Sequence, residues 1–165
     1  MSLPLTEDPE RCGFVVAHRF LRLHTAARTE FIDLTPHVCR LVHEAGLDEG
    51  LVTVQTQHTT TAIVANEAEP LLHGDVEGLL ERWAPRAGGY RHDRNDLRTV
   101  NVVPGERPNA DAHARAMLLG ASESFAVVDG RIALGRWQRI FLVELDGPRL
   151  RKIAVALAGH GGARP

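Results

Sequence analysis

The chain has 165 residues and a formal net charge of −2 at pH 7. This length suits one domain with a hydrophobic core, so we expect a single domain over residues 1–165 with its core at about 14–159. The nearly balanced charge argues against a nucleic-acid footprint spread over the whole surface, and we expect no nucleic-acid partner. No apolar run approaches the roughly 20 residues that span a bilayer, so we expect no membrane association.

The cysteine content and the N-terminus indicate the cellular compartment. The two cysteines, Cys12 and Cys39, form no CxxC pair, which favours a reducing compartment and no structural disulfide. The first 13 residues have no basic region followed by an apolar run, and therefore do not read as a signal peptide. We expect a cytoplasmic protein.

The N-terminal half alternates short strands with two helices. Phe14–His24 and Thr29–Leu34 have strand patterns and are expected to form a hairpin around Thr25–Arg28. Thr35 is the expected N-cap of a helix with Pro36 at its first position, which ends near Gly46. Further along the chain we expect strands at Gly50–Gln57 and Ala62–Ala65, and a helix that starts at Glu69-Pro70 and ends at Pro85.

The C-terminal half begins with an irregular stretch, Arg86–Asn109, of a length that is often functional inside a compact domain. Asn109 is the expected N-cap of a short helix that ends at Gly120. Strands follow at Glu123–Val128, Arg131–Leu134, Trp137–Leu145 and Leu150–Leu157, with turns at Asp129-Gly130 and Gly147-Pro148. This order predicts an α+β domain, in which two main helices and one short helix cover a largely antiparallel, sandwich-like sheet.

Three histidines stand at the ends of predicted elements or in the long loop: His58, His92 and His113. Imidazole binds divalent metals such as zinc and shuttles protons near neutral pH. Asp93 or Asp96 could add a ligand or orient a ring. The spacing matches no HExxH or zinc-finger pattern, so spacing alone favours the alternative that each ring caps a turn or lies on the surface.

Other polar residues also have two explanations. Glu67, after Asn66, either caps a helix or is a carboxylate in the cleft of His58. Ser122 either caps a turn or holds a phosphate. Gln138 and Glu144 are unexpected among the apolar residues of their strand. The arginines at 131, 149 and 151 suit phosphate or carboxylate, and surface salt bridges are the alternative, favoured for Arg151.

Several short motifs in this sequence match those of a known family. They are His58-Thr59, Asn66-Glu67, Tyr90-x-His92, Asn109-x-x-x-His113, Leu119-Gly120-x-Ser122, Asp129-Gly130-Arg131 and LGxWQxIxLxExDGPR over residues 134–149. Through these motifs the chain, from Phe14 to Gly159, resembles the YjbQ-like family, also called the secondary thiamine-phosphate synthase family. The resemblance implies a small α+β domain assembled as a homotrimer. It also implies a polar pocket between subunits, where the histidines gather and a divalent metal, zinc or magnesium, binds.

The activity that the resemblance implies is a weak thiamine-phosphate synthase reaction. A hydroxymethylpyrimidine diphosphate is joined to a thiazole phosphate with release of diphosphate, which needs cationic groups or a metal at the leaving group. On this basis the site is assigned in three groups: catalytic Glu67, His92, Glu144 and Arg149; substrate- or anion-binding Asn66, Ser122, Arg131 and Gln138; and metal-binding His58, His92 and His113. The segment between His92 and His113 is longer than in shorter family members.

Two other classes stay open at this stage. One is a metal-dependent hydrolase or transferase that acts on another small phosphorylated metabolite. The other is a non-catalytic metal-binding or ligand-binding trimer. A pocket of histidine, glutamate and arginine is compatible with each of them.

Overall fold

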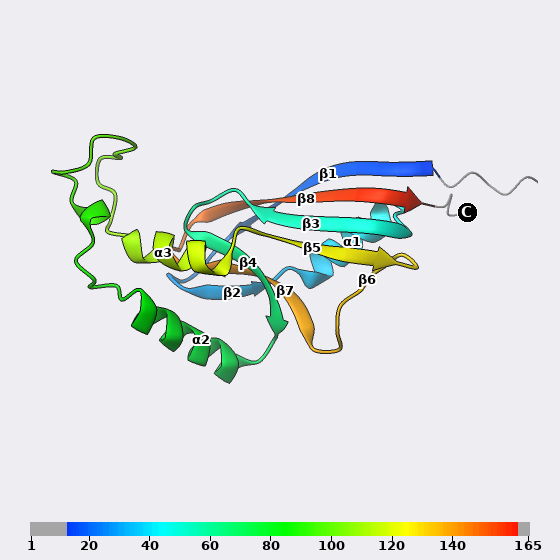
Figure 1. Ribbon diagram of the computed structural model, residues 1–165. Helices are drawn as coiled ribbons and strands as arrows, with labels where there is room; N and C mark the ends of the chain where they lie inside the picture. Colours follow the sequence, from blue (N-terminus) through cyan, green and yellow to red (C-terminus); the bar gives the residue numbers. More distant parts are fainter. Residues whose placement is uncertain (1–12, 162–165) are drawn as a thin grey trace, which may run out of the picture.

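Two antiparallel sheets and three α-helices make up residues 13–161, the part of the chain that this computed structural model describes (Figure 1). The sheets have the strand orders β1-β8-β3-β5-β6 and β2-β7-β4. The elements in chain order are β1 (Gly13–His24), β2 (Glu30–Asp33), α1 (Thr35–Glu44), β3 (Glu49–Thr56), β4 (Thr61–Glu67), α2 (Pro70–Trp83), the 3-10 turn η1 (Arg91–Asp93), α3 (Ala110–Leu119), β5 (Ser122–Val128), β6 (Arg131–Ile132), β7 (Gln138–Glu144) and β8 (Leu150–Gly161). The predicted α+β class is confirmed, and its strands divide between two sheets.

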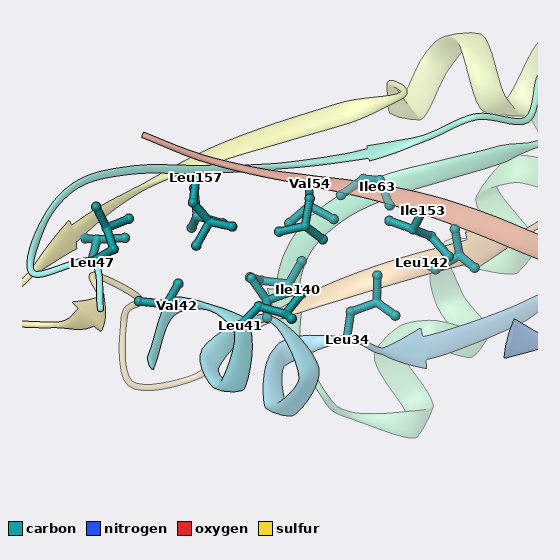
Figure 2. Packing of buried hydrophobic residues seen from close by; sticks show 14 residues of the cluster. Leu34, Leu41, Val42, Leu47, Val54, Ile63, Ile140, Leu142, Ile153 and Leu157 are labelled. Atoms are coloured by element: carbon teal, nitrogen blue, oxygen red, sulfur yellow. The ribbon is translucent and has the colours of Figure 1, made fainter. Parts of the chain in front are cut away.

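Strand β7 lies between two hydrophobic layers because successive side chains of a strand point to opposite faces. Ile140 and Leu142 point into a core between the small sheet, helix α1 and the inner face of the large sheet (Figure 2). Phe141 and Val143 point the other way, into a second core against α2 and α3. The resulting layers are the large sheet, then the small sheet with α1, then α2 and α3.

The helix starts match the sequence pattern, with two changes in the capping groups. Thr35 is the first residue of α1, not its N-cap, and Asp33 Oδ1 accepts a hydrogen bond from its backbone N–H at 2.8 Å. Asn109 occupies the N-cap position of α3, but its side chain does not cap the helix. Asp93 Oδ1 replaces it by accepting from the backbone N–H groups of Asn109 and Ala110, both at 3.0 Å. The long loop therefore holds the start of α3.

The predicted Asp129-Gly130 hairpin is confirmed between β5 and β6, and both turn residues have the positive φ that such a turn requires, 50° and 70°. The strand expected at Arg131–Leu134 is shorter, since β6 contains only Arg131 and Ile132. Cys39 is a free, exposed thiol. Cys12, the other cysteine in the sequence analysis, lies outside the described residues. None of the described helices is long and apolar enough to cross a membrane.

The hairpin predicted around Thr25–Arg28 is wrong. Strand β1 pairs with β8 along its whole length, and β2 pairs with β7 in the other sheet. The chain changes sheets six times, and three of these crossovers follow β1, β3 and β7. These crossovers lie together, because Thr25 N–H donates to the Arg149 carbonyl at 3.0 Å and Leu145 N–H donates to the Thr60 carbonyl at 3.2 Å.

A buried ion pair joins the three crossovers. Glu144 at the end of β7 is fully buried, and Arg151 near the start of β8 is 4% exposed. The Arg151 Nε and Nη2 groups donate to the two carboxylate oxygens of Glu144, each at 2.6 Å. Thr25 Oγ1 also donates to Glu144, at 3.0 Å, and Arg151 Nη2 donates to Thr60 Oγ1 at 3.1 Å. The surface salt bridge expected for Arg151 is therefore wrong, because this guanidinium links both sheets in the interior.

Replacing Arg151 by Ala leaves the Glu144 carboxylate buried without its cation. We expect the free energy of unfolding to fall by about 3–5 kcal/mol, the usual loss when one partner of a buried pair is removed. Urea denaturation followed by circular dichroism measures this loss. The matched control is Arg40→Ala, because Arg40 is 60% exposed and its pair with Glu44 lies on the helix surface; a loss below about 0.5 kcal/mol is expected there. Equal losses for the two variants would contradict the structural role of the buried pair.

Candidate functional site

A polar pocket of about 260 Å³ opens beside the three crossovers. Its wall comes from four places in the chain: the β3–β4 connection, the end of the long loop, α3 and the β7–β8 turn. The lining residues are Gln57, His58, Thr59, Thr60, Glu106, Asn109, His113, Asp146, Arg149 and Arg151. The fold thus brings together residues more than 90 positions apart in the sequence, such as Thr60 and Arg151, which share a hydrogen bond.

Asp146 fixes one side of this pocket. Its carboxylate is 1% exposed and accepts hydrogen bonds from Asn109 Nδ2 at 3.1 Å, Arg107 Nε at 2.9 Å and Arg149 Nη2 at 2.7 Å. Burial alone would raise the pKa of Asp146, but the hydrogen bond from Asn109 and the charges of Arg149 and Arg107 outweigh it and hold this pKa below its ordinary value. The ionised carboxylate therefore orients two guanidinium groups beside the pocket.

His58 presents a hydrogen-bond donor to the pocket. Its Nε2 accepts the backbone N–H of Lys152 at 2.8 Å, so the neutral ring carries its proton on Nδ1. Burial, followed by the positive charge of Arg151, lowers the pKa of His58 and favours this neutral form. The Nε2 lone pair is already used by Lys152, and Nδ1 carries the proton, so the ring in this state offers no free lone pair to a metal.

His113 lines the pocket, and His92 lies against His113 without lining the pocket itself. Their ring centroids are 4.8 Å apart in an edge-to-face arrangement. Burial, and then the charge of His92, lowers the pKa of His113. The Nε2 atom of His92 is buried and has no hydrogen-bond partner in the described part of the chain. A buried polar atom without a partner is costly, and marks a place where a ligand or proton donor would be stabilising.

These positions do not form the three-histidine metal site expected from the sequence. Across residues 13–161, no three or more His, Cys, Asp or Glu side chains are grouped as metal ligands. Two of the three predicted rings, His92 and His113, are adjacent, while His58 is engaged with the backbone of β8. Within one chain, the positions of these rings do not fit a metal held by all three.

Glu144 and Arg149, both assigned to catalysis from the sequence, have different positions. Arg149 lines the pocket and is 41% exposed, with Nε donating to the Asp146 carbonyl at 3.0 Å. Glu144 is fully buried behind Arg151, and both of its oxygens accept hydrogen bonds from protein groups. A substrate in the pocket would meet Arg149 directly, whereas Glu144 acts only by positioning Arg151.

The remaining predicted site residues do not line the pocket. Asn66 and Glu67 end strand β4, opposite Arg139 and Gln138 of β7. Strand β4 starts next to the pocket, so a rise of about 3.3 Å per residue places Glu67 roughly 20 Å away. Arg131 lies in the β5–β6 hairpin. Ser122 is exposed at the start of β5, adjacent to Ala121, which lines a neighbouring hollow.

Sequence reasoning missed Asp146, Arg107 and the side-chain role of Asn109. Asp146 lies inside the motif Glu-x-Asp-Gly-Pro-Arg, between the candidate site residues Glu144 and Arg149. This position could have indicated that Asp146 belongs to the site. The sequence predicts Asn109 only as a helix cap, yet its amide donates to Asp146 and, at 3.4 Å, to Glu106. Arg107 carried no signal, because nothing in the local pattern of the long loop shows where that loop folds back.

A less polar hollow of about 460 Å³ adjoins the polar pocket. The two share His58, Thr59 and His113, and the hollow continues over Ala116, Met117, Gly120 and Ala121. The two histidines therefore lie at the boundary between a region of charged donors and a region of apolar groups. This combination suits a ligand with an anionic group at one end and a ring at the other.

The lowered pKa of His58 predicts how stability depends on pH. The unfolded chain takes up a proton at this histidine near pH 6.5, before the folded chain does. We therefore expect the contribution of His58 to be complete above about pH 6.5 and to decrease as the pH falls toward the lower pKa of the folded state. Urea titrations between about pH 7.5 and 5 measure the effect, and His58→Gln should show a weaker pH dependence. Identical pH dependence in the two proteins would contradict the neutral state assigned to His58.

Comparison with known proteins gives a consistent family relationship. The family model described as "UPF0047 protein YjbQ-like" matches residues 19–160. A UPF0047 protein of Methanothermobacter thermautotrophicus is 41% identical over 151 residues, which cover 90% of this chain and 98% of the relative. A UPF0047 protein of Archaeoglobus fulgidus is 46% identical over 135 residues, which cover 82% of this chain and 96% of the relative.

Solved structures agree with the sequence comparison. A crystal structure of a YbjQ-like protein of unknown function from Sulfolobus solfataricus superposes with a TM-score of 0.80 at 34% identity, covering 89% of this chain and 99% of the other. A hypothetical protein from Aeropyrum pernix superposes with a TM-score of 0.77 at 33% identity, covering 87% of this chain and 98% of the other. The chain belongs to the UPF0047, or YjbQ-like, family.

Proposed function

We propose that the chain is an enzyme that binds small phosphorylated metabolites and catalyses a thiamine-phosphate synthase type of transfer. The observation that carries this proposal is the boundary position of His58 and His113. They separate a pocket with the donors of Arg149 and His58 from an apolar hollow that accommodates a ring. The resemblance of the site motifs to the secondary thiamine-phosphate synthase family supports the same reaction. Its phosphorylated substrates fit the cytoplasmic location expected from the sequence.

The reaction forms one bond and breaks one bond. A ring nitrogen of the thiazole phosphate donates its lone pair to the methylene carbon of the pyrimidine diphosphate and forms a C–N bond. The C–O bond to the diphosphate breaks, and the electron pair leaves with the diphosphate. No proton leaves the attacking nitrogen, so the site needs no strong base, in agreement with the distance of Glu67 from the pocket.

The main requirement is stabilisation of the negative charge on the leaving diphosphate. Arg149 is held in place by Asp146 and retains N–H groups that no described residue accepts. The Nδ1–H group of His58 adds a neutral donor, because its other nitrogen is occupied by Lys152. Preorganised donors of this kind stabilise developing charge without reorganising during the reaction. A divalent ion, zinc or magnesium, that enters with the diphosphate would add positive charge and is part of the test.

The direct test supplies both substrates to the purified protein and measures thiamine phosphate and diphosphate release. Both products are expected, and Arg149→Gln and His58→Ala should each lower kcat/KM by about 100-fold, as loss of a charge-stabilising group commonly does. His37→Ala is the matched control, because His37 is exposed on α1, and should retain wild-type turnover. Assays with added zinc or magnesium, and with a chelator, measure the metal requirement. Equal turnover by wild type and both site variants would contradict the proposed site.

Other outcomes separate the two remaining classes. Release of orthophosphate or diphosphate from a single substrate, without joining, would indicate a hydrolase instead. Tight binding of either substrate without any product would indicate a non-catalytic binding module. Each result would replace the proposed transfer.

We also propose that the chain assembles as the homotrimer implied by the family resemblance. The outer face of the large sheet supports this, because it exposes Phe14, Val16 and Phe20 of β1 together with Leu51 of β3, between 53% and 67% exposed. The pairing of β1 and β3 with β8 places these side chains on one face, with Ala154 and Ala158 between them. Contiguous exposed apolar surface of this kind marks protein interfaces.

Replacing Val16 by Glu puts a charge on this face, opposite Ala158. Light scattering after size-exclusion chromatography should give a trimer for the wild type and a smaller species for Val16→Glu, because burying an unpaired charge in an interface is unfavourable. Val100→Glu is the control, since Val100 is equally apolar and 72% exposed but lies in the long loop. A wild-type monomer, or a trimer that persists in Val16→Glu, would contradict the assignment of this face.

A further inference from the structure

A second hollow of about 460 Å³ lies on the other side of Arg149. Residues 103–107 of the long loop form one wall, and Pro148 and Arg149 of the β7–β8 turn form the other. It shares Glu106 and Arg149 with the polar pocket. The two spaces are therefore neighbours, and Arg149 stands between them.

Two guanidinium groups border this hollow, and the same carboxylate orients both. Asp146 accepts from Arg107 Nε at 2.9 Å through one oxygen and from Arg149 Nη2 at 2.7 Å through the other. Arg107 Nη2 also donates to the Gly147 carbonyl at 2.6 Å. The Nη1 groups of both arginines have no hydrogen-bond partner within residues 13–161. The side chains are 42% and 41% exposed, so each combines a fixed orientation with free donors.

The charges around the hollow leave an excess of positive charge. Glu106, the acidic residue in the wall, is paired with Arg98 at 2.9 Å, and this pairing holds the pKa of Glu106 below its ordinary value. Glu106 pairs with Arg98, while Asp146 pairs with Arg107, with Arg149 and, at 3.8 Å, with Arg28, which also pairs with Asp111. Planar guanidinium donors held side by side are the usual recognition group for a phosphate monoester.

We propose that Arg107 and Arg149 form a second anion subsite, which takes the phosphate monoester of the second substrate. This inference rests on the proposed function, in which two phosphorylated molecules must lie next to each other. The diphosphate would occupy the polar pocket near His58, and the monophosphate would occupy the hollow near Arg107. Arg149 would contact both anions, and Arg107, from the longer loop of this chain, would determine specificity for the monophosphate.

The test compares the KM values of the two substrates in Arg107→Gln. We expect the KM for the monophosphate to rise about tenfold, the size of effect from losing one charge-assisted hydrogen bond, while the KM for the diphosphate stays within about twofold. Arg107→Lys should recover part of the loss because it restores the charge but not the planar pair of donors. Arg94→Gln is the matched control, since Arg94 forms an exposed pair with Asp96 in the same loop and does not line the hollow.

A second measurement separates this inference from the proposed function. Calorimetric titration with inorganic phosphate requires no turnover, and its affinity should fall about tenfold in Arg107→Gln but stay within about twofold in Arg94→Gln. If synthesis is absent and this pattern is present, the reaction is wrong and the anion subsite stands. If Arg107→Gln matches the wild type in phosphate affinity and in both KM values, the subsite is wrong whatever the reaction. Thermal denaturation of each variant establishes that it is folded.

Discussion

The buried pair of Glu144 and Arg151 is the interaction on which the arrangement of the two sheets depends. Taking both charges out of water is unfavourable by several kcal/mol each, so such a pair persists only when every polar atom has a partner. Here the carboxylate accepts from Thr25, from Arg151 and from the backbone N–H groups of Leu145 and Asp146. The threonine and the arginine belong to different crossovers, so satisfying this one carboxylate requires the crossovers to meet.

The same constraint builds the pocket. Asp146 and Arg149 follow Glu144 in the turn that returns the chain to the large sheet, and His58 lies in the crossover that contains Thr60. Because Glu144 and Arg151 hold these segments together, the pocket residues have fixed positions before any ligand binds. Donors on a rigid support stabilise an anion without first having to be ordered, which is the main benefit of preorganisation. The long loop adds Arg107 to this rigid wall through Asp146.

Local signals in the sequence predicted helix starts and turns well, but they predicted poorly which strands pair with each other. Pro70 and the carboxylate of Glu69, which accepts from Leu71 and Leu72, define the start of α2 within a few residues. The Asp129-Gly130 turn is equally local. The partner of β1 is not, because β1 pairs with a strand more than 100 residues away. An alternating pattern predicts which face of a strand is buried, but not which strand lies beside it.

The candidate site shows the same division. His92 and His113 carried a recognisable chemistry and are adjacent in the fold. Glu67 and Gln138 belong to the same motif set, yet they face each other in β4 and β7 at the end away from the pocket. Residues of one sequence motif can lie far apart in the fold, because the two ends of a seven-residue strand are about 20 Å apart. Arg107 belongs to no motif and could not be predicted as a site residue, because only the folded loop brings it to Asp146.

We infer that the junction of the two sheets is a preformed anion site. A crystal structure of the protein grown with inorganic diphosphate examines this inference. We expect a diphosphate in the polar pocket, within hydrogen-bond distance of His58 Nδ1 and the Arg149 guanidinium, with Asp146 still holding Arg149. An empty pocket at saturating diphosphate, or a diphosphate bound only at the far end near Glu67, would contradict it.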